Sequence, residues 1–236
     1  MRTLAVISRK GGVGKTTLSV NLAVAAYHAG LRTVLADLDG QRSASAWAKV
    51  RQVAGPAVLE TTAGKLFPMW SAAANAGCQL MILDTPARGE AEALQALRLA
   101  DLCLLVGRPN FFDVEALGRS IDLLRQFERP GLIVLNQAPS RRMGRESEAV
   151  QTAADALGRS GTPLARVGLR HRAIFPASAA KGLSAAELDP ASAGAREVEG
   201  VWAEVRDRLG ATCAGASPAG WLPGTPQVQG RSSVSP

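Results

Sequence analysis

The segment SRKGGVGKTTLS, residues Ser8–Ser19, places two lysines in one glycine-rich loop. It follows a short apolar run and precedes a stretch with helical periodicity, so we expect it to join a strand to a helix. Glycines let backbone amides converge on phosphate oxygens, and the start of a helix adds the positive end of its dipole. The residues predicted to line this loop are Lys10, Gly11, Gly12, Val13, Gly14, Lys15, Thr16 and Thr17.

Two side chains next to the glycines have the chemistry that a nucleotide needs. Lys15 would reach the β- and γ-phosphates, and the Thr16 hydroxyl would bind Mg²⁺. The alternative is a glycine-rich turn that binds no ligand. Strand, loop, Lys-Thr pair and helix follow in the order that a phosphate-binding loop requires, which favours the nucleotide site. The ordinary pattern fails at its first glycine, where this chain has Arg9 followed by Lys10.

The stretch KGGVGKTT, residues Lys10–Thr17, resembles the deviant Walker-A loop of the ParA/MinD family of ATPases. The resemblance implies ATP as the cofactor, together with Mg²⁺. It also implies that Lys10 crosses the interface of a homodimer to the phosphates bound by the partner subunit, while Lys15 is the ordinary phosphate-binding lysine. Nucleotide binding and dimerisation would then be one event. The alternative role for Lys10 is that of a solvated surface charge.

A second motif, VLADLDGQRSASAW at Val34–Trp47, is similar to the next conserved segment of that family. The similarity implies that Asp39 positions or activates the attacking water and belongs to the metal site, with Asp37 near the metal. A carboxylate at the carboxyl end of a strand that faces the phosphates suits such a role. Two residues depart from the family pattern: Gly40 stands where Pro is usual, and Arg42 replaces a Gly. The Arg42 departure could alter the local backbone conformation and the rate of ATP hydrolysis.

Two further strand ends resemble functional positions of the family. In LMILDTPA, residues Leu80–Ala87, the match to the Walker-B strand implies that Asp84 holds Mg²⁺, through water. In VLNQ, residues Val134–Gln137, it implies that Asn136 contacts adenine, whereas an asparagine at a strand end is otherwise a turn former. The resemblance continues to Leu209.

The alternation of short apolar runs with helical patterns predicts a doubly wound α/β fold. We expect a mostly parallel sheet with helices on both faces, the architecture of a P-loop NTPase, over residues 1–210. Strands are predicted at Thr3–Ser8, Arg32–Asp37, Gln79–Asp84, Leu102–Gly107, Gly131–Asn136 and, more weakly, Pro163–Gly168. Helices are predicted at Lys15–Ala29, Ser43–Val50, Ala91–Leu99, Val114–Phe127, Glu146–Leu157 and Gly194–Leu209. The segment 211–236 is rich in Pro, Gly and Ser, which predicts a disordered tail.

Composition excludes several classes of protein. The 236 residues include three cysteines without zinc or iron–sulfur spacing, which argues against a disulfide framework and a metal cluster. The same cysteine usage favours a reducing cytoplasm. No apolar run reaches the length of a membrane span, and the polar tail does not suggest membrane targeting, so we expect no membrane association. The formal net charge of +7 permits contact with nucleic acid.

Within the family, the residues favour the ParA branch. The chain lacks the basic amphipathic helix at its end by which MinD-like relatives lie on membranes. ParA-type proteins bind DNA non-specifically as ATP-bound dimers, associate with the nucleoid, and are stimulated by a ParB-like or other partner protein. The basic side chains predicted to contact DNA are Arg141, Arg142, Arg170, Arg172 and Lys181. For any single one of these, the alternative is a solvated surface charge.

The resemblance to the ParA branch implies a weak, partner-stimulated ATPase that positions or segregates a plasmid, a chromosome or another large cargo. Two alternatives stay open. One is a small-molecule ligase or kinase of the dethiobiotin-synthetase type, against which Lys10 argues. The other is an ATP-switched scaffold that does not hydrolyse, which Arg42 makes conceivable.

Overall fold

The computed structural model describes residues 1–210; the tail predicted at 211–236 lies outside the described residues. Six parallel strands form one sheet in the order β3-β2-β4-β1-β5-β6. Their bounds are β1 (Arg2–Ile7), β2 (Thr33–Asp37), β3 (Ala57–Glu60), β4 (Leu80–Asp84), β5 (Leu102–Gly107) and β6 (Gly131–Leu135). Apolar residues fill the central strands, because helices cover both faces of a parallel sheet. The predicted doubly wound fold is confirmed.

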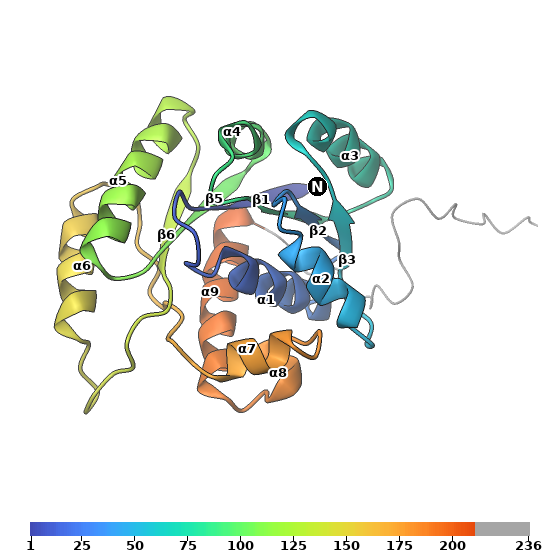
Figure 1. Cartoon of the computed structure of the whole chain (residues 1–236). Coiled ribbons are helices and arrows are strands. Elements are labelled where there is room, and N and C mark those ends of the chain that lie inside the picture. The colour runs from blue at the N-terminus through green and yellow to red at the C-terminus, as the bar shows by residue number, and fades with distance from the viewer. Residues whose placement is uncertain (211–236) are drawn as a thin grey trace, which may run out of the picture.

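Helices divide into two layers, one on each face of the sheet (Figure 1). The first layer is α1 (Lys15–His28), α2 (Ser43–Val50), α7 (Ile174–Ala179), α8 (Ala185–Leu188) and α9 (Ala193–Leu209). The second is α3 (Ala63–Asn75), α4 (Glu90–Leu99), α5 (Phe111–Gln126) and α6 (Glu148–Gly158). Each layer has its own apolar core, with Trp202 of α9 fully buried in the first. Because all six strands are parallel, their carboxyl ends lie at the same edge of the sheet, which is where ligands bind in such folds.

Four elements were absent from the sequence-based prediction. Strand β3 is a short edge strand whose side chains are only partly buried, so it lacks the apolar signal of a central strand. Helix α3 contains Pro68, a residue that ordinarily argues against a helix interior. Helices α7 and α8 have six and four residues, too few for a periodic pattern.

The prediction of a strand at Pro163–Gly168 was wrong. This segment runs beside β6 and exchanges backbone hydrogen bonds with Ile133, but it forms only an isolated bridge between Leu164 and Ile133. Helix α5 also begins earlier than predicted. The Asn110 side chain accepts a hydrogen bond from the Asp113 amide at 3.0 Å and caps the helix there.

Candidate functional site

The glycine-rich loop joins β1 to α1, as the sequence predicted. Gly12 and Gly14 have φ angles of 71° and 89°, the left-handed region that glycine adopts at little cost. A Cβ atom on Gly14 would lie 2.3 Å from Nδ2 of Asn136, so only glycine fits there. The backbone conformation of the loop therefore requires glycine at these two positions.

Lys15 is the lysine inside the loop. Its side chain is 7% exposed, and Nζ donates a hydrogen bond to the Lys10 carbonyl at 3.3 Å. Burial lowers the pKa of Lys15, while the charges of Asp84 and Asp39 oppose that shift. A partly desolvated ammonium group enclosed by loop backbone is suited to hold phosphate oxygens.

Asp84 ends β4 beside the loop and is completely buried. One carboxylate oxygen accepts a hydrogen bond from Ser19 Oγ at 3.1 Å, and the other has no partner among residues 1–210. Burial raises the pKa of Asp84 to about 7, and the nearby hydroxyl groups of Thr16 and Ser19 oppose that shift. A buried carboxylate oxygen without a partner, next to the Thr16 hydroxyl, fits a hydrated Mg²⁺ ion. The described residues contain no cluster of three His, Cys, Asp or Glu side chains, and a P-loop magnesium site does not need one.

Asp37 has a structural task. One carboxylate oxygen accepts hydrogen bonds from the amide and the hydroxyl of Ser45, at 2.9 and 2.8 Å, and the other accepts from the Asp39 amide. Asp37 pairs with Asp84 in the sheet register, so it does lie near the predicted metal position. One of its oxygens is nonetheless occupied by Ser45 of α2 and the other by the Asp39 amide in the connection before that helix.

Asp39 follows β2 at the carboxyl edge. It is partly exposed, and its carboxylate accepts a hydrogen bond from the Gln41 amide at 2.9 Å. Its negative charge opposes the lowering of the Lys15 pKa, so the Asp39 carboxylate lies within electrostatic reach of the Lys15 ammonium group. Its role toward water or metal stays a prediction.

Arg42 explains one departure from the family pattern. Its φ is 53°, so the backbone keeps the left-handed conformation that a glycine would adopt. The guanidinium group donates from Nη1 to the carbonyls of Asp37 and Thr61, at 2.8 and 3.1 Å, and pairs with Glu60 at 3.5 Å. Arg42 thus connects the ends of β2 and β3.

Asn136 contacts the phosphate loop directly. Its side-chain Nδ2 donates to the Val13 carbonyl at 2.7 Å, and its Oδ1 accepts from the Gln137 amide. Gln137 reaches the same loop, because its Nε2 donates to the Gly12 carbonyl at 2.7 Å. In this subunit the Asn136 amide holds the loop, and an adenine contact stays a prediction.

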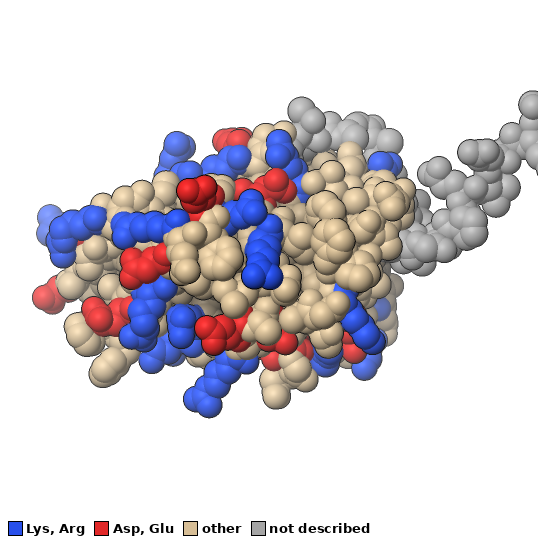
Figure 2. Space-filling model, turned by 90° about the horizontal axis from the view of Figure 1, so that it is seen from above, with Lys and Arg blue, Asp and Glu red and all other residues tan. Residues whose placement is uncertain are grey.

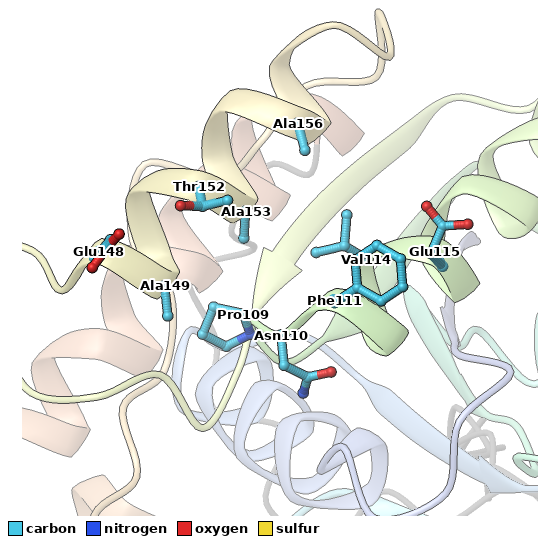
Figure 3. A pocket seen from close by; sticks show the side chains of 10 residues that line it. All are labelled: Pro109, Asn110, Phe111, Val114, Glu115, Glu148, Ala149, Thr152, Ala153 and Ala156. Atoms are coloured by element: carbon cyan, nitrogen blue, oxygen red, sulfur yellow. The ribbon is translucent and has the colours of Figure 1, made fainter.

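Lys10 points away from its own loop. Its Nζ lies 5.8 Å from the centre of the Phe112 ring, on the first turn of α5. Phe111 and Phe112 are 71% and 70% exposed. The Phe111 ring lines a pocket of about 450 Å³ between α5 and α6 (Figure 3). Phe112 does not line this pocket and instead contacts Lys10.

The basic residues predicted to contact DNA differ in their availability. Arg170 is 9% exposed and forms ion pairs with Glu146, and Arg172 is held by Glu197 at 2.6 Å. Arg141 is exposed but also pairs with Glu146, whereas Arg142 and Lys181 are exposed and have no acidic partner within residues 1–210. The role of these five residues in DNA binding stays a prediction.

The face covered by α3, α4 and α5 does not present another basic surface for DNA. Figure 2 shows acidic and basic side chains interspersed over it, rather than one continuous basic patch. No described helix is long and apolar enough to cross a membrane.

Sequence reasoning missed three residues of the site. Ser19 binds Asp84, Gln137 holds the loop, and Phe112 contacts Lys10. Ser19 could have been found from its spacing, since it lies three residues after Thr16 on the same face of α1. The other two contacts join segments more than one hundred residues apart, and no local pattern indicates them.

Comparison with known proteins agrees with this geometry. The model of the CobQ/CobB/MinD/ParA nucleotide-binding domain matches residues 4–184. The maintenance of carboxysome distribution protein A of Gloeobacter kilaueensis is 33% identical over 88% of this chain and 94% of its own length.

Solved structures share the fold. The septum site-determining protein MinD of Pyrococcus horikoshii, complexed with Mg-ADP, superposes with a TM-score of 0.73 at 19% identity, over 91% of this chain and 99% of its own. A variant of McdA from Cyanothece, complexed with ATP, gives 0.69 at 14% identity, over 90% and 97%. The match to the family model and the relative from Gloeobacter kilaueensis, together with the glycine-rich loop and the buried carboxylate beside it, show that the chain belongs to the CobQ/CobB/MinD/ParA family of nucleotide-binding proteins.

Proposed function

We propose that this chain is a ParA-type ATPase that dimerises on ATP, binds DNA without sequence preference and positions a large cargo. The observation that carries the proposal is the separation of the two lysines. Lys15 is buried inside the phosphate loop, whereas the Lys10 side chain leaves it toward α5. A lysine with no task in its own loop is free to serve the nucleotide of a second subunit.

Hydrolysis would follow from the groups at the carboxyl edge. Lys15 and the loop amides bind the β- and γ-phosphates, and Thr16 and Asp84 hold the Mg²⁺ that neutralises their charge. Asp39 orients the attacking water by accepting a hydrogen bond from it. Lys10 of the partner adds a cation that is present only in the dimer, so turnover depends on assembly.

The cargo is proposed by similarity. The relative from Gloeobacter kilaueensis is named for the maintenance of carboxysome distribution, which supports a large cargo other than a plasmid or chromosome. A stimulating partner protein, ParB-like or of another kind, would connect the cargo to the ATP-bound dimer on the nucleoid.

The test is sedimentation velocity of Lys10→Ala, with and without ATP, at concentrations where the wild type dimerises. Each dimer loses two charge-assisted contacts of about 1.5–3 kcal/mol, so dimerisation should weaken by roughly a hundredfold or more. ATP binding to the monomer should persist, because Lys15 and the loop amides are unchanged. Lys49→Ala is the matched control, since Lys49 is exposed on α2 and has no ion pair in the described chain.

Two outcomes would contradict the proposal. Normal ATP-dependent dimerisation of Lys10→Ala would make Lys10 a surface charge. A wild-type dimer that turns over no ATP, with or without DNA, would be an ATP-switched scaffold instead of an ATPase.

A further inference from the structure

A tight hairpin projects from the connection between β6 and α6 (Figure 1, lower left, yellow-green). We call residues Arg141–Arg145 the arginine hairpin. The Arg142 amide donates to the Arg145 carbonyl at 3.1 Å, and the Arg145 amide donates back to Arg142 at 2.9 Å. The two residues between them, Met143 and Gly144, have φ angles of 50° and 78°. Two successive left-handed residues are typical of the type I′ turn that closes a two-residue hairpin.

The base of the hairpin is clamped to the body of the protein. Glu146 accepts hydrogen bonds from both terminal nitrogens of the Arg170 guanidinium group, at 2.7 and 2.5 Å, and from Arg141 Nε at 2.5 Å. Arg170 also donates to the Pro139 carbonyl at 2.8 Å. The hydrogen bonds from Arg170, followed by those from Arg141, lower the pKa of Glu146 to about 2, so the clamp persists at neutral pH. Arg170 is therefore occupied inside the subunit, whereas the exposed Arg141 shares the same carboxylate.

The tip of the hairpin is free. Arg142 and Arg145 are exposed, and neither has an acidic partner within residues 1–210. Met143 is fully exposed between them. A non-glycine residue at positive φ is strained, and an apolar side chain in water contributes nothing to folding. A hairpin that presents one apolar side chain between two cations without acidic partners has the chemistry of a binding element.

We propose that the arginine hairpin enters the minor groove of duplex DNA, with Arg142 and Arg145 on the flanking phosphates and Met143 as an apolar wedge against the bases. The proposal rests on the DNA-binding dimer proposed above and names its contact element. Methionine is among the apolar side chains that minor-groove proteins insert at base steps, and cations on phosphates supply affinity without sequence preference. An anionic membrane fits less well, because one methionine buries too little apolar area for stable binding.

The same element links DNA binding to ATP. One hairpin carries two free arginines and would bind DNA weakly at physiological salt. A dimer carries two hairpins, and the second binds at the high effective concentration set by the first. DNA affinity would therefore rise steeply when ATP joins the subunits.

The test is fluorescence anisotropy of the full chain with ATP and Mg²⁺ on a 40-base-pair duplex of arbitrary sequence, over a series of salt concentrations. Arg142→Glu with Arg145→Glu should weaken binding at least thirtyfold at low salt. Because four phosphate contacts are lost per dimer, the slope of log affinity against log salt should fall by about three to four. Met143→Ala should weaken binding by about threefold to tenfold and leave that slope unchanged, and Met143→Leu should bind like the wild type.

The matched control is Arg98→Glu with Arg119→Glu. These two arginines are exposed on α4 and α5 without ion pairs among the described residues, and the change in net charge is identical. Sedimentation in ATP shows whether each variant still folds and dimerises. Binding by the control should stay within about threefold of the wild type.

Three results would overturn the hairpin as the contact. The first is a wild type that binds DNA in ATP while both sets of hairpin variants bind equally well, which leaves the proposed function standing. The second is an equal loss of binding in the control variant. The third is a hairpin-dependent loss of binding to phosphatidylserine vesicles with DNA binding intact. A wild-type dimer that does not bind DNA contradicts the proposed function itself.

Discussion

The Lys10 ammonium group lies 5.8 Å from the centre of the Phe112 ring in the same subunit, and that ring is 70% exposed. A cation over an aromatic face at an exposed site gains about 0.5–1 kcal/mol. In the proposed dimer, Lys10 must leave this position for the phosphates of the other subunit. The contact therefore stabilises the separate subunit.

We predict that Phe112→Ala strengthens ATP-dependent dimerisation, by roughly fivefold to thirtyfold when both subunits lose the contact. Sedimentation equilibrium in ATP measures the change. Phe67→Ala is the control, because Phe67 is an exposed ring on α3 that stacks on Trp70 and not on a lysine. Weaker dimerisation of Phe112→Ala would mean that the ring itself belongs to the interface.

Lys15→Ala should weaken ATP binding by at least about a hundredfold, equivalent to ~3 kcal/mol, because the phosphates lose a cation held in a partly desolvated loop. Isothermal titration of the monomer with ATP measures the loss. Lys10→Ala, titrated in the same way, should keep nearly the wild-type affinity. Equal affinities for wild type and Lys15→Ala would exclude the loop as the phosphate site.

Asp39→Ala should keep ATP binding and dimerisation but slow hydrolysis, so that the ATP-bound dimer accumulates. Water positioning is lost while Lys15, Thr16 and Asp84 remain. Phosphate release with DNA present measures the rate. If turnover stayed within about threefold of wild type, or ~0.7 kcal/mol of barrier, another group would have to orient the water.

Arg42→Gly tests the connection between β2 and β3. The substitution relieves a strained left-handed residue but removes the hydrogen bonds to Asp37 and Thr61 and the ion pair with Glu60. The charged hydrogen bonds outweigh the strain, so we expect a net loss of about 1–2 kcal/mol in the free energy of unfolding. Urea denaturation measures it, with Arg119→Ala as an exposed control that has no ion pair among residues 1–210. An unchanged or higher stability would show that the guanidinium group contributes nothing net.

Glu187 provides a pH-dependent contact between the end of α2 and α8. Although burial opposes ionisation, hydrogen bonds from Arg51, the Ser184 amide and His28 hold its pKa at about 2, below the ordinary value of 4.5. A lowered pKa contributes stability above pH 4.5, and that contribution is lost as the pH falls from 4.5 toward 2.

Glu187→Gln should therefore lower the free energy of unfolding by about 2–3 kcal/mol at pH 7. The difference from wild type should shrink as the pH falls from 4.5 to 3 in urea titrations. Glu115→Gln is the control, since Glu115 is exposed and has no ion pair in residues 1–210. A difference that stayed constant with pH would mean that the Glu187 charge is not what stabilises the contact.

The sequence-based prediction of the fold was correct where the local sequence patterns were strong. The central strands are continuous apolar runs, and the phosphate loop is specified by glycines whose positive φ angles no other residue adopts as readily. Strand β3 and helix α3 escaped prediction because an edge strand needs little apolar content and Pro68 resembles a helix breaker.

The sequence by itself determined the nucleotide loop, the carboxylate that ends β4 and the alternation of buried strands with helices, because each depends on residues adjacent in the chain. Only the tertiary structure decided which charges are free. Arg170 and Arg142 look alike in the sequence, yet Glu146 neutralises the first while the second extends from a hairpin into solvent. The same is true of Lys10, whose position depends on a ring about one hundred residues away. Ion pairing and exposure depend on distances between segments that folding brings together, and no spacing along the chain records them.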